Sequence, residues 1–289
     1  MAITADQVKL LRDKTGVGMM DCKKALTEAN GDFDKAIEIL RKKGAAVAAK
    51  RAERTANEGI VLTRISDDKK KAYMVEVNCE TDFVARSDDF INFGNLVINA
   101  IVNHQPKNVE ELMNINHNGK IIKQELEDLL GRIGEKVAVS RFIVETTETG
   151  LLVDYVHHGS KLGVLVRVDQ LGNGDINEML DIEKDVAMQV AAMKPIYVYR
   201  EEVPKEVIEK EMEIYKEVSR KEGKPEQILE KIALGKLTKY YQENCLFEQT
   251  FIKDNSKAVS DLFKEYNKKY STNAKLVLFY RYHLSDEKK

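Results

Sequence analysis

Few side chains in this sequence have the types and spacing that covalent chemistry needs. Cys79 and Glu80 are adjacent, and a histidine pair, His157 and His158, lies far along the chain. A cysteine with a histidine base and a carboxylate could support hydrolysis if the fold brings them within hydrogen-bond reach. Adjacent strand residues point to opposite faces, so the two histidines are poorly placed to share a metal ion. The hydrolase interpretation therefore depends on the distance between Cys79 and His158.

Phosphate-binding loops are also missing from the sequence. The string GRIGEK at 131–136 lacks the GxxxxGK[ST] spacing, and its glycines favour the end of a helix. No GxGxxG follows an expected strand. We therefore predict no cofactor, no metal ion and no enzymatic activity.

The segment Thr81-Asp82-Phe83-Val84 is unusual because it places an aromatic residue between an expected strand and an expected helix. Two interpretations stay open. Phe83 could pack under the sheet as part of the core. It could instead protrude as a wedge, with Asp82 beside it free to accept hydrogen bonds.

A second unusual pair is Met19-Met20, which opens a helix after a glycine-rich turn. Both side chains cannot face a three-helix core at once. Either one is buried and the other has no role, or the exposed methionine is an adaptable contact for another protein.

The 289 residues carry 46 Lys and Arg against 48 Asp and Glu, a formal net charge of −2. This balance weighs against nucleic acid as the main partner. A nucleic-acid-binding alternative would use the basic stretch Lys50, Arg51 and Arg54.

Three cysteines without a CxxC pattern, Cys22, Cys79 and Cys245, predict reduced thiols and a cytoplasmic location, with no further role assigned to them. The start MAITADQVKLL lacks the features of a signal peptide, and no apolar run predicts a membrane span.

The elements that must position these residues alternate between helices and hairpins. Three short helices are expected in the first 44 residues, the last ending at Gly44, and an Ala-rich helical linker follows over 45–57. Strands are expected at 59–66 and 72–78, and again at 150–156 and 162–169, an offset of 91. Helices follow each hairpin, so we predict an α+β protein whose core is a duplicated unit of antiparallel sheet and helices. Chance similarity of two valine-rich hairpins is the alternative.

Residues 204–242 predict an antiparallel helical hairpin, because Gly223-Lys224-Pro225 separates two charged amphipathic stretches. This arm could pair with a second copy of the chain or only stabilise the core.

Four motifs resemble the bacterial elongation factor Ts family in the expected order. They are KLLRDKTGVGMMDCKKAL, ETDFVARSDDF, HHGSKLGVLV and EGKPEQILEKIALGKLTKYYQENCLFEQTF, and the resemblance extends from about residue 2 to about 283. It implies an N-terminal three-helix bundle similar to ubiquitin-associated domains, a two-part core and an inserted arm. The expected division is 1–54 for the helical docking module, 55–145 for the first half of the core, 146–203 with 243–284 for the second half, and 204–242 for the arm.

The resemblance further implies a guanine-nucleotide exchange factor that binds elongation factor Tu and disturbs its Mg²⁺ site during translation elongation. Residues Thr81, Asp82, Phe83, Val84 and Ala85 would enter the partner. Residues Arg12, Met19, Met20, Lys23 and His158 would dock on it. Some members carry another helical module after the last strand, whereas this sequence stops at LSDEKK, so that contact is expected to be missing or very small. Neither nucleic acid nor membrane is an expected partner.

Overall fold

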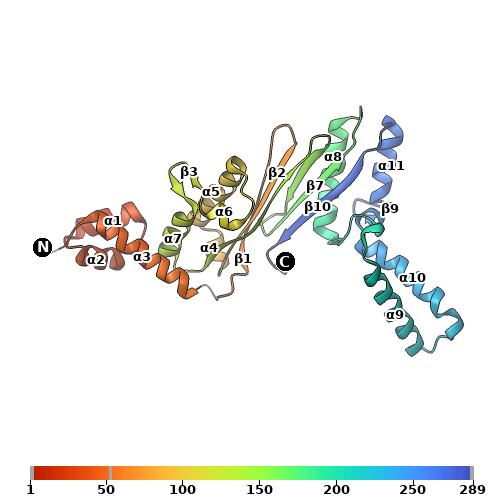
Figure 1. Ribbon diagram of the computed structural model, residues 1–289, viewed down its shortest axis with the longest axis horizontal. Helices are drawn as coiled ribbons and strands as arrows, with labels where there is room; N and C mark the ends of the chain where they lie inside the picture. Colours follow the sequence, from red (N-terminus) through yellow and green to blue (C-terminus); the bar gives the residue numbers. More distant parts are fainter. Residues whose placement is uncertain (1–2, 52–53, 287–289) are drawn as a thin grey trace.

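The computed structural model describes residues 3–51 and 54–286. It describes the side chains at all of these positions except 45 and 47–51. Figure 1 shows an elongated molecule, with a helical module near the N-terminus, two sheets in the middle and a helical hairpin extending from the opposite end. The mixture of helices and antiparallel sheets confirms the predicted α+β class. Among the described residues, no helix combines the length and apolar character that crossing a bilayer requires.

The N-terminal module consists of three helices: α1 (Ala5–Thr15), α2 (Met19–Glu28) and α3 (Phe33–Arg51). A capping box opens α1, since the Thr4 side chain accepts a hydrogen bond from the Gln7 backbone and the Gln7 side chain accepts one from the Thr4 backbone. Leu11, Cys22 and Leu26 are fully buried in its small core.

The predicted end of the third helix at Gly44 is wrong, because α3 continues to Arg51. Gly44 lies inside the helix, where a Cβ atom would come 2.7 Å from the Glu127 carbonyl oxygen. This glycine therefore permits a close approach between two helices instead of ending one. The predicted helical linker over 45–57 is helical only as far as Arg51 among the described residues.

Two three-stranded antiparallel sheets form the middle of the molecule. The first has the order β1 (Glu58–Ile65), β2 (Lys71–Cys79), β5 (Val137–Thr146). The second has the order β6 (Leu151–Val156), β7 (Leu162–Asp169), β10 (Lys275–His283).

Helices cover the outer face of each sheet, and the inner faces meet (Figure 1). Helices α5 (Asp88–His104) and α7 (Ile122–Ile133) pack on the first sheet, and α8 (Ile176–Met193) and α11 (Val259–Tyr270) on the second. Strand β2 alternates as a two-faced strand must, with Val75 toward the helices and Met74 toward the other sheet. Val61 and Met74 of the first half pack there with Leu152 and Leu165 of the second.

Hydrogen bonds between the halves follow the repeat found in the sequence. The Val61 N–H donates to the Ser160 carbonyl at 2.6 Å, and the Leu152 N–H donates to the Lys69 carbonyl at 2.9 Å. Residues 61 and 69 correspond to 152 and 160 at the same offset of 91. Equal strand order and equivalent cross-contacts favour duplication over chance similarity.

Different segments lie between the outer helix and the third strand of each half. The first half carries α6 (Val109–Met113) and a small hairpin of β3 (Asn116–His117) and β4 (Lys120–Ile121), neither of which the sequence analysis predicted. The second half carries η1 (Arg200–Glu202), the arm helices α9 (Lys205–Lys221) and α10 (Glu226–Asn244), η2 (Leu246–Glu248), β8 (Thr250–Phe251) and β9 (Asp254–Ala258).

The two helices of the arm are joined to each other by the ion pair Lys216–Glu230 at 2.8 Å, and Leu229 and Leu237 of α10 are buried. The domain boundaries and the pairing of two copies through this arm stay predictions.

Candidate protein-binding site

Phe83 is the most exposed of the large apolar side chains in the described part of the chain, with 83% of its surface accessible. It lies on α4 (Asp82–Ala85), a single helical turn between β2 and α5. Val84 packs against the core of the first half, and Ala85 is buried. The core interpretation of Phe83 is therefore wrong: its neighbours anchor the turn, and the aromatic ring is left at the surface.

The Phe83 turn, residues 81–85, is held by a carboxylate that is distant in the sequence. The Thr81 N–H donates to one oxygen of Glu135 at 3.0 Å, and the Thr81 hydroxyl donates to the other at 2.8 Å. The Thr81 oxygen in turn accepts from the Val84 N–H at 3.4 Å and caps the turn. The turn is thus fixed at its first residue from two directions.

A second contact braces the residue before the turn. The Glu80 carboxylate accepts a hydrogen bond from the Lys136 N–H at 2.7 Å and forms an ion pair with Arg54 at 3.1 Å. The side chain of Lys136 reaches the Arg54 carbonyl at 2.8 Å. The chain segments around residues 54, 80 and 135 are therefore tied together at the start of the Phe83 turn.

Asp82 is already partnered, which differs from the free acceptor that the wedge interpretation expected. Its carboxylate pairs with Arg86 one turn later at 2.7 Å, in a position where 40% of the Asp82 side chain is exposed. Exposed ion pairs of this kind contribute about 0–1 kcal/mol, so exchanging Arg86 for donors of another molecule would cost little.

The N-terminal module exposes both methionines of its second helix. Met19 is 42% and Met20 is 65% accessible, so the interpretation that buries one of them is wrong. Arg12 and Lys23 are exposed as well. Leu10 on α1 is also exposed, and sequence reasoning missed it because its helix face could not be told from the apolar pattern alone.

His158 lies in the turn between β6 and β7 and is exposed. The neighbouring His157 is exposed too, with its Nδ1 2.8 Å from the Tyr155 hydroxyl. The same turn supplies the Ser160 carbonyl that binds β1 of the first half. The structure therefore places His158 on a turn that is hydrogen-bonded to β1, in the other half of the core from Phe83.

The hydrolase alternative fails on the state of its nucleophile. The Cys79 thiol is buried and donates to the Thr81 carbonyl at 3.2 Å instead of to a histidine. Burial, reinforced by the nearby carboxylates of Glu135 and Glu58, raises the pKa of Cys79 to about 12. A thiol with this pKa supplies almost no thiolate at neutral pH.

The remaining alternatives find little support among the described residues. No group of three or more His, Cys, Asp or Glu side chains in the described ranges is placed to hold a metal ion. Of the basic stretch, Arg54 pairs with Glu80, and the side chains of Lys50 and Arg51 lie outside the described part of the chain.

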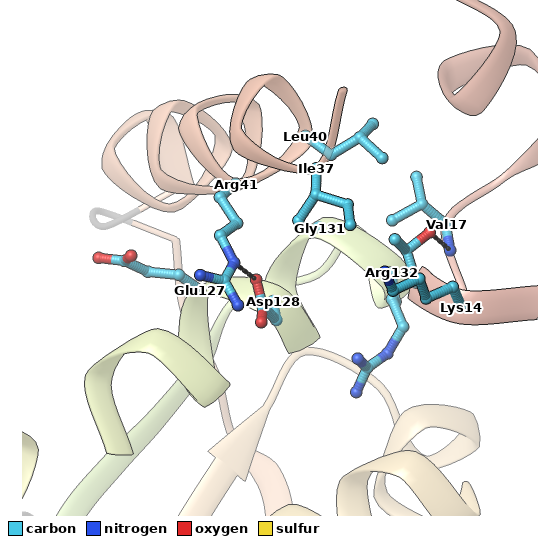
Figure 2. A pocket seen from close by; sticks show the side chains of 10 residues that line it. Lys14, Val17, Ile37, Leu40, Arg41, Glu127, Asp128, Gly131 and Arg132 are labelled. Carbon is cyan, nitrogen blue, oxygen red and sulfur yellow. Dashed lines mark hydrogen bonds and ion pairs between the residues drawn. The ribbon is translucent and has the colours of Figure 1, made fainter. Parts of the chain in front are cut away.

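One cavity of about 200 Å³ lies between the N-terminal module and α7. Figure 2 shows Ile37, Leu40 and Arg41 of α3 on one side of it and Asp128, Gly131 and Arg132 of α7 on the other. Arg41 and Asp128 form an ion pair across it at 3.5 Å. It is a gap in the packing between two units, with no nucleophile and base brought together in its lining.

These features define an α+β protein whose distinctive side chains are apolar groups exposed on braced elements, a pattern typical of proteins that bind other proteins.

Comparison with known proteins narrows this class. The family model described as elongation factor TS matches residues 80–286. An elongation factor Ts of Chloroherpeton thalassium is 46% identical over 289 residues, covering 99% of each chain. That of Chlorobium phaeobacteroides is 46% identical over 286 residues (98% of each chain), and that of Clostridium perfringens 43% over 281 residues, covering 97% of this chain and 92% of the relative. The chain belongs to the elongation factor Ts family and is a translation elongation factor.

Proposed function

We propose that this protein is a guanine-nucleotide exchange factor for elongation factor Tu, with no covalent chemistry of its own. Membership of the elongation factor Ts family supports the partner. The observation that carries the mechanism is the exposed Phe83 side chain on a turn whose backbone is held by Glu135. A role in translation elongation also agrees with the predicted cytoplasmic location.

The partner's GDP is held by backbone N–H groups around its phosphates and by Mg²⁺. A second protein speeds GDP release only if it binds the nucleotide-free partner more tightly than the GDP-bound one. Because binding free energies are linked, nucleotide then weakens the factor as much as the factor weakens nucleotide. The factor therefore needs a contact that only the nucleotide-free form accommodates.

Phe83 is suited to be that contact. Insertion of its ring between elements of the partner would displace the groups around Mg²⁺, whose octahedral geometry at 2.0–2.1 Å tolerates little movement. Burial of the ring returns about 1.5–3 kcal/mol to offset the distortion. Since Thr81 and Ala85 are already fixed, little conformational entropy is lost when the ring is buried. Asp82 can exchange Arg86 for backbone donors that the distortion exposes.

The other exposed residues would provide affinity instead of distortion. Met19 and Met20 offer adaptable apolar contacts on the N-terminal module, and Arg12 and Lys23 are exposed basic residues of the same module. His158 would contact a different part of the partner from the second half of the core. Docking at two distant places holds the partner while Phe83 acts between them.

Stopped-flow release of fluorescently labelled GDP from elongation factor Tu tests the proposal. Addition of the wild-type protein should accelerate release in a saturable manner. The acceleration should shrink when Mg²⁺ is first removed with EDTA, because the factor would then have no metal coordination left to disturb. Unchanged release would exclude the exchange function, and equal acceleration with and without Mg²⁺ would exclude the metal route.

A further inference from the structure

Glu135 connects the two proposed partner-facing surfaces: it binds the Phe83 turn directly, and it is joined to the N-terminal module through α7. It follows α7 directly, after Gly134, whose left-handed conformation (φ 72°) ends that helix. Its two carboxylate oxygens accept from the Thr81 N–H and the Thr81 hydroxyl. Any displacement of Glu135 must therefore move or release the first residue of the Phe83 turn.

The other side of α7 holds the N-terminal module. Gly44 of α3 packs so closely on α7 that a Cβ atom there would lie 2.7 Å from the Glu127 carbonyl oxygen. Arg41 pairs with Asp128 at 3.5 Å across the same contact, on the face shown in Figure 2. The module that exposes Met19 and Met20 is thus seated on the helix that ends at the brace of Phe83.

Helix α7 has 12 residues, which makes it about 18 Å long at 1.5 Å per residue. A helix of this length transmits position because its backbone hydrogen bonds leave no soft dihedral angles. The Glu135 contact at the end of α7 is therefore one tie between the docking surface and the exposed aromatic ring, beside the Glu80 contacts to Arg54 and Lys136 and the packing of Val84 and Ala85.

We propose that Glu135 is a positioning residue for nucleotide exchange: it holds the Phe83 turn at a fixed place relative to the N-terminal docking module, through α7. This inference rests on the proposed exchange function. Glu135 itself acts through Thr81, and the geometry of its two acceptor oxygens, not its charge, is what exchange needs.

Three substitutions separate geometry from charge. Glu135→Gln removes the charge but can still accept from the Thr81 N–H through its oxygen while its amide group donates to the Thr81 hydroxyl. Glu135→Asp keeps the charge but retracts the oxygens by roughly 1.5 Å, the length of one carbon–carbon bond. Glu135→Ala removes both acceptors.

The measurement is the rate of GDP release from elongation factor Tu as a function of factor concentration. Glu135→Ala should lower the maximal rate by about tenfold, equivalent to ~1.4 kcal/mol in the barrier, while the half-saturating concentration stays within about twofold. Glu135→Gln should restore most of the maximal rate, and Glu135→Asp should restore less. Activity retained by Glu135→Asp and lost in Glu135→Gln would overturn the geometric role. An increase in the half-saturating concentration alone would assign Glu135 to docking and overturn the inference too.

Amide hydrogen exchange in the isolated protein distinguishes a failed brace from a failed function. Exchange at the Val84 and Ala85 amides, which bond to the Thr81 hydroxyl and carbonyl, should be faster in Glu135→Ala than in the wild type. Unchanged exchange there would overturn the inference even if the wild-type protein releases GDP. Faster exchange with no GDP release by the wild type would place the failure in the proposed function instead.

Discussion

The two halves of the core share a scaffold and differ in what connects its parts. Each half has a three-stranded sheet in the same order, with a helix capped at its C-terminus by a left-handed residue, Gln105 in one and Lys194 in the other. After the second strand, the first half forms the Phe83 turn. The second half forms the turn 170–175, where a Cβ atom on Gly174 would lie 2.1 Å from the Tyr266 hydroxyl oxygen.

The contrast shows where a new property can be added to a repeated fold. In the first half, Glu135 supports the turn from below and leaves space outside for an aromatic ring. In the second half, Tyr266 occupies the space that a protruding side chain would need, and its hydroxyl donates to the Asp175 carbonyl at 3.0 Å. The strands and helices are under the same packing demands in both halves, whereas the connections are free to diverge.

The largest expected effect concerns Glu183, a buried acid of the second half that lacks the arginine partner of Glu76, the buried acid of the first half. Glu183 on α8 is fully buried, and neither of its carboxylate oxygens has a partner. At the offset of 89 between the helix ends, its counterpart in α5 is Gly94. Burial, with a smaller contribution from Asp169, raises the pKa of Glu183 well above 4.5. The folded protein therefore keeps this proton to a higher pH than the unfolded chain does.

Because the folded state binds more protons, stability from this group is lost as pH rises above about 4.5, by up to ~1.4 kcal/mol per pH unit until the folded-state pKa is passed. Glu183→Gln should remove that slope, so the free energy of unfolding of the variant should increase relative to that of the wild type as the pH rises. Urea unfolding between pH 5 and 8 measures it. Parallel pH profiles for the two proteins would show that the carboxyl finds a partner in solution.

A smaller effect is expected from adding a side chain at the second turn, where Tyr266 already occupies the space. Gly174→Ala should destabilise the protein by about 1–3 kcal/mol, because the added methyl group overlaps the Tyr266 ring and hydroxyl. Gly235→Ala on the arm is the matched control: nothing lies within 4 Å of its added methyl, and alanine favours a helix interior. Chemical denaturation of both variants decides the matter, and equal stability would mean that the second turn can accept a side chain after all.

The smallest effect is expected at the docking surface, outside both halves. Met20→Ala should raise the half-saturating concentration for GDP release about fivefold, or ~1 kcal/mol, and leave the maximal rate unchanged. Leu234→Ala, which removes an exposed apolar group from the arm, serves as control. A drop in the maximal rate of Met20→Ala would mean that the module takes part in the distortion as well as in docking.

Sequence patterns predicted the regular elements well because strands and helices have periods of their own. Strand patterns located both hairpins, the offset of 91 between them indicated the repeat, and the α+β class is confirmed. Gly44 was misjudged because a glycine that ends a helix and a glycine that allows two helices to touch have the same sequence signal. Long-range packing alone distinguishes them.

The candidate site was only partly accessible to sequence reasoning. The motif located Phe83, but its exposure depends on Val84 and Ala85 being the residues that face the core, which a one-turn helix decides. Glu135 could not be predicted. It binds Thr81, which is 54 residues away in the sequence, and a single glutamate belongs to no recognisable motif. Contacts of this range become visible only when the strands and α7 are placed in space.

The central claim is that the first half acts on the partner's nucleotide through one exposed aromatic ring. The direct test compares the maximal rate of GDP release with Phe83→Ala and with Ile176→Ala, which trims an exposed side chain just after the corresponding turn of the second half. Phe83→Ala removes an interface contact worth about 2–3 kcal/mol, so its maximal rate of GDP release should fall roughly 30- to 150-fold. The maximal rate with Ile176→Ala should stay near that of the wild type. Equal rates for the two variants would contradict the account.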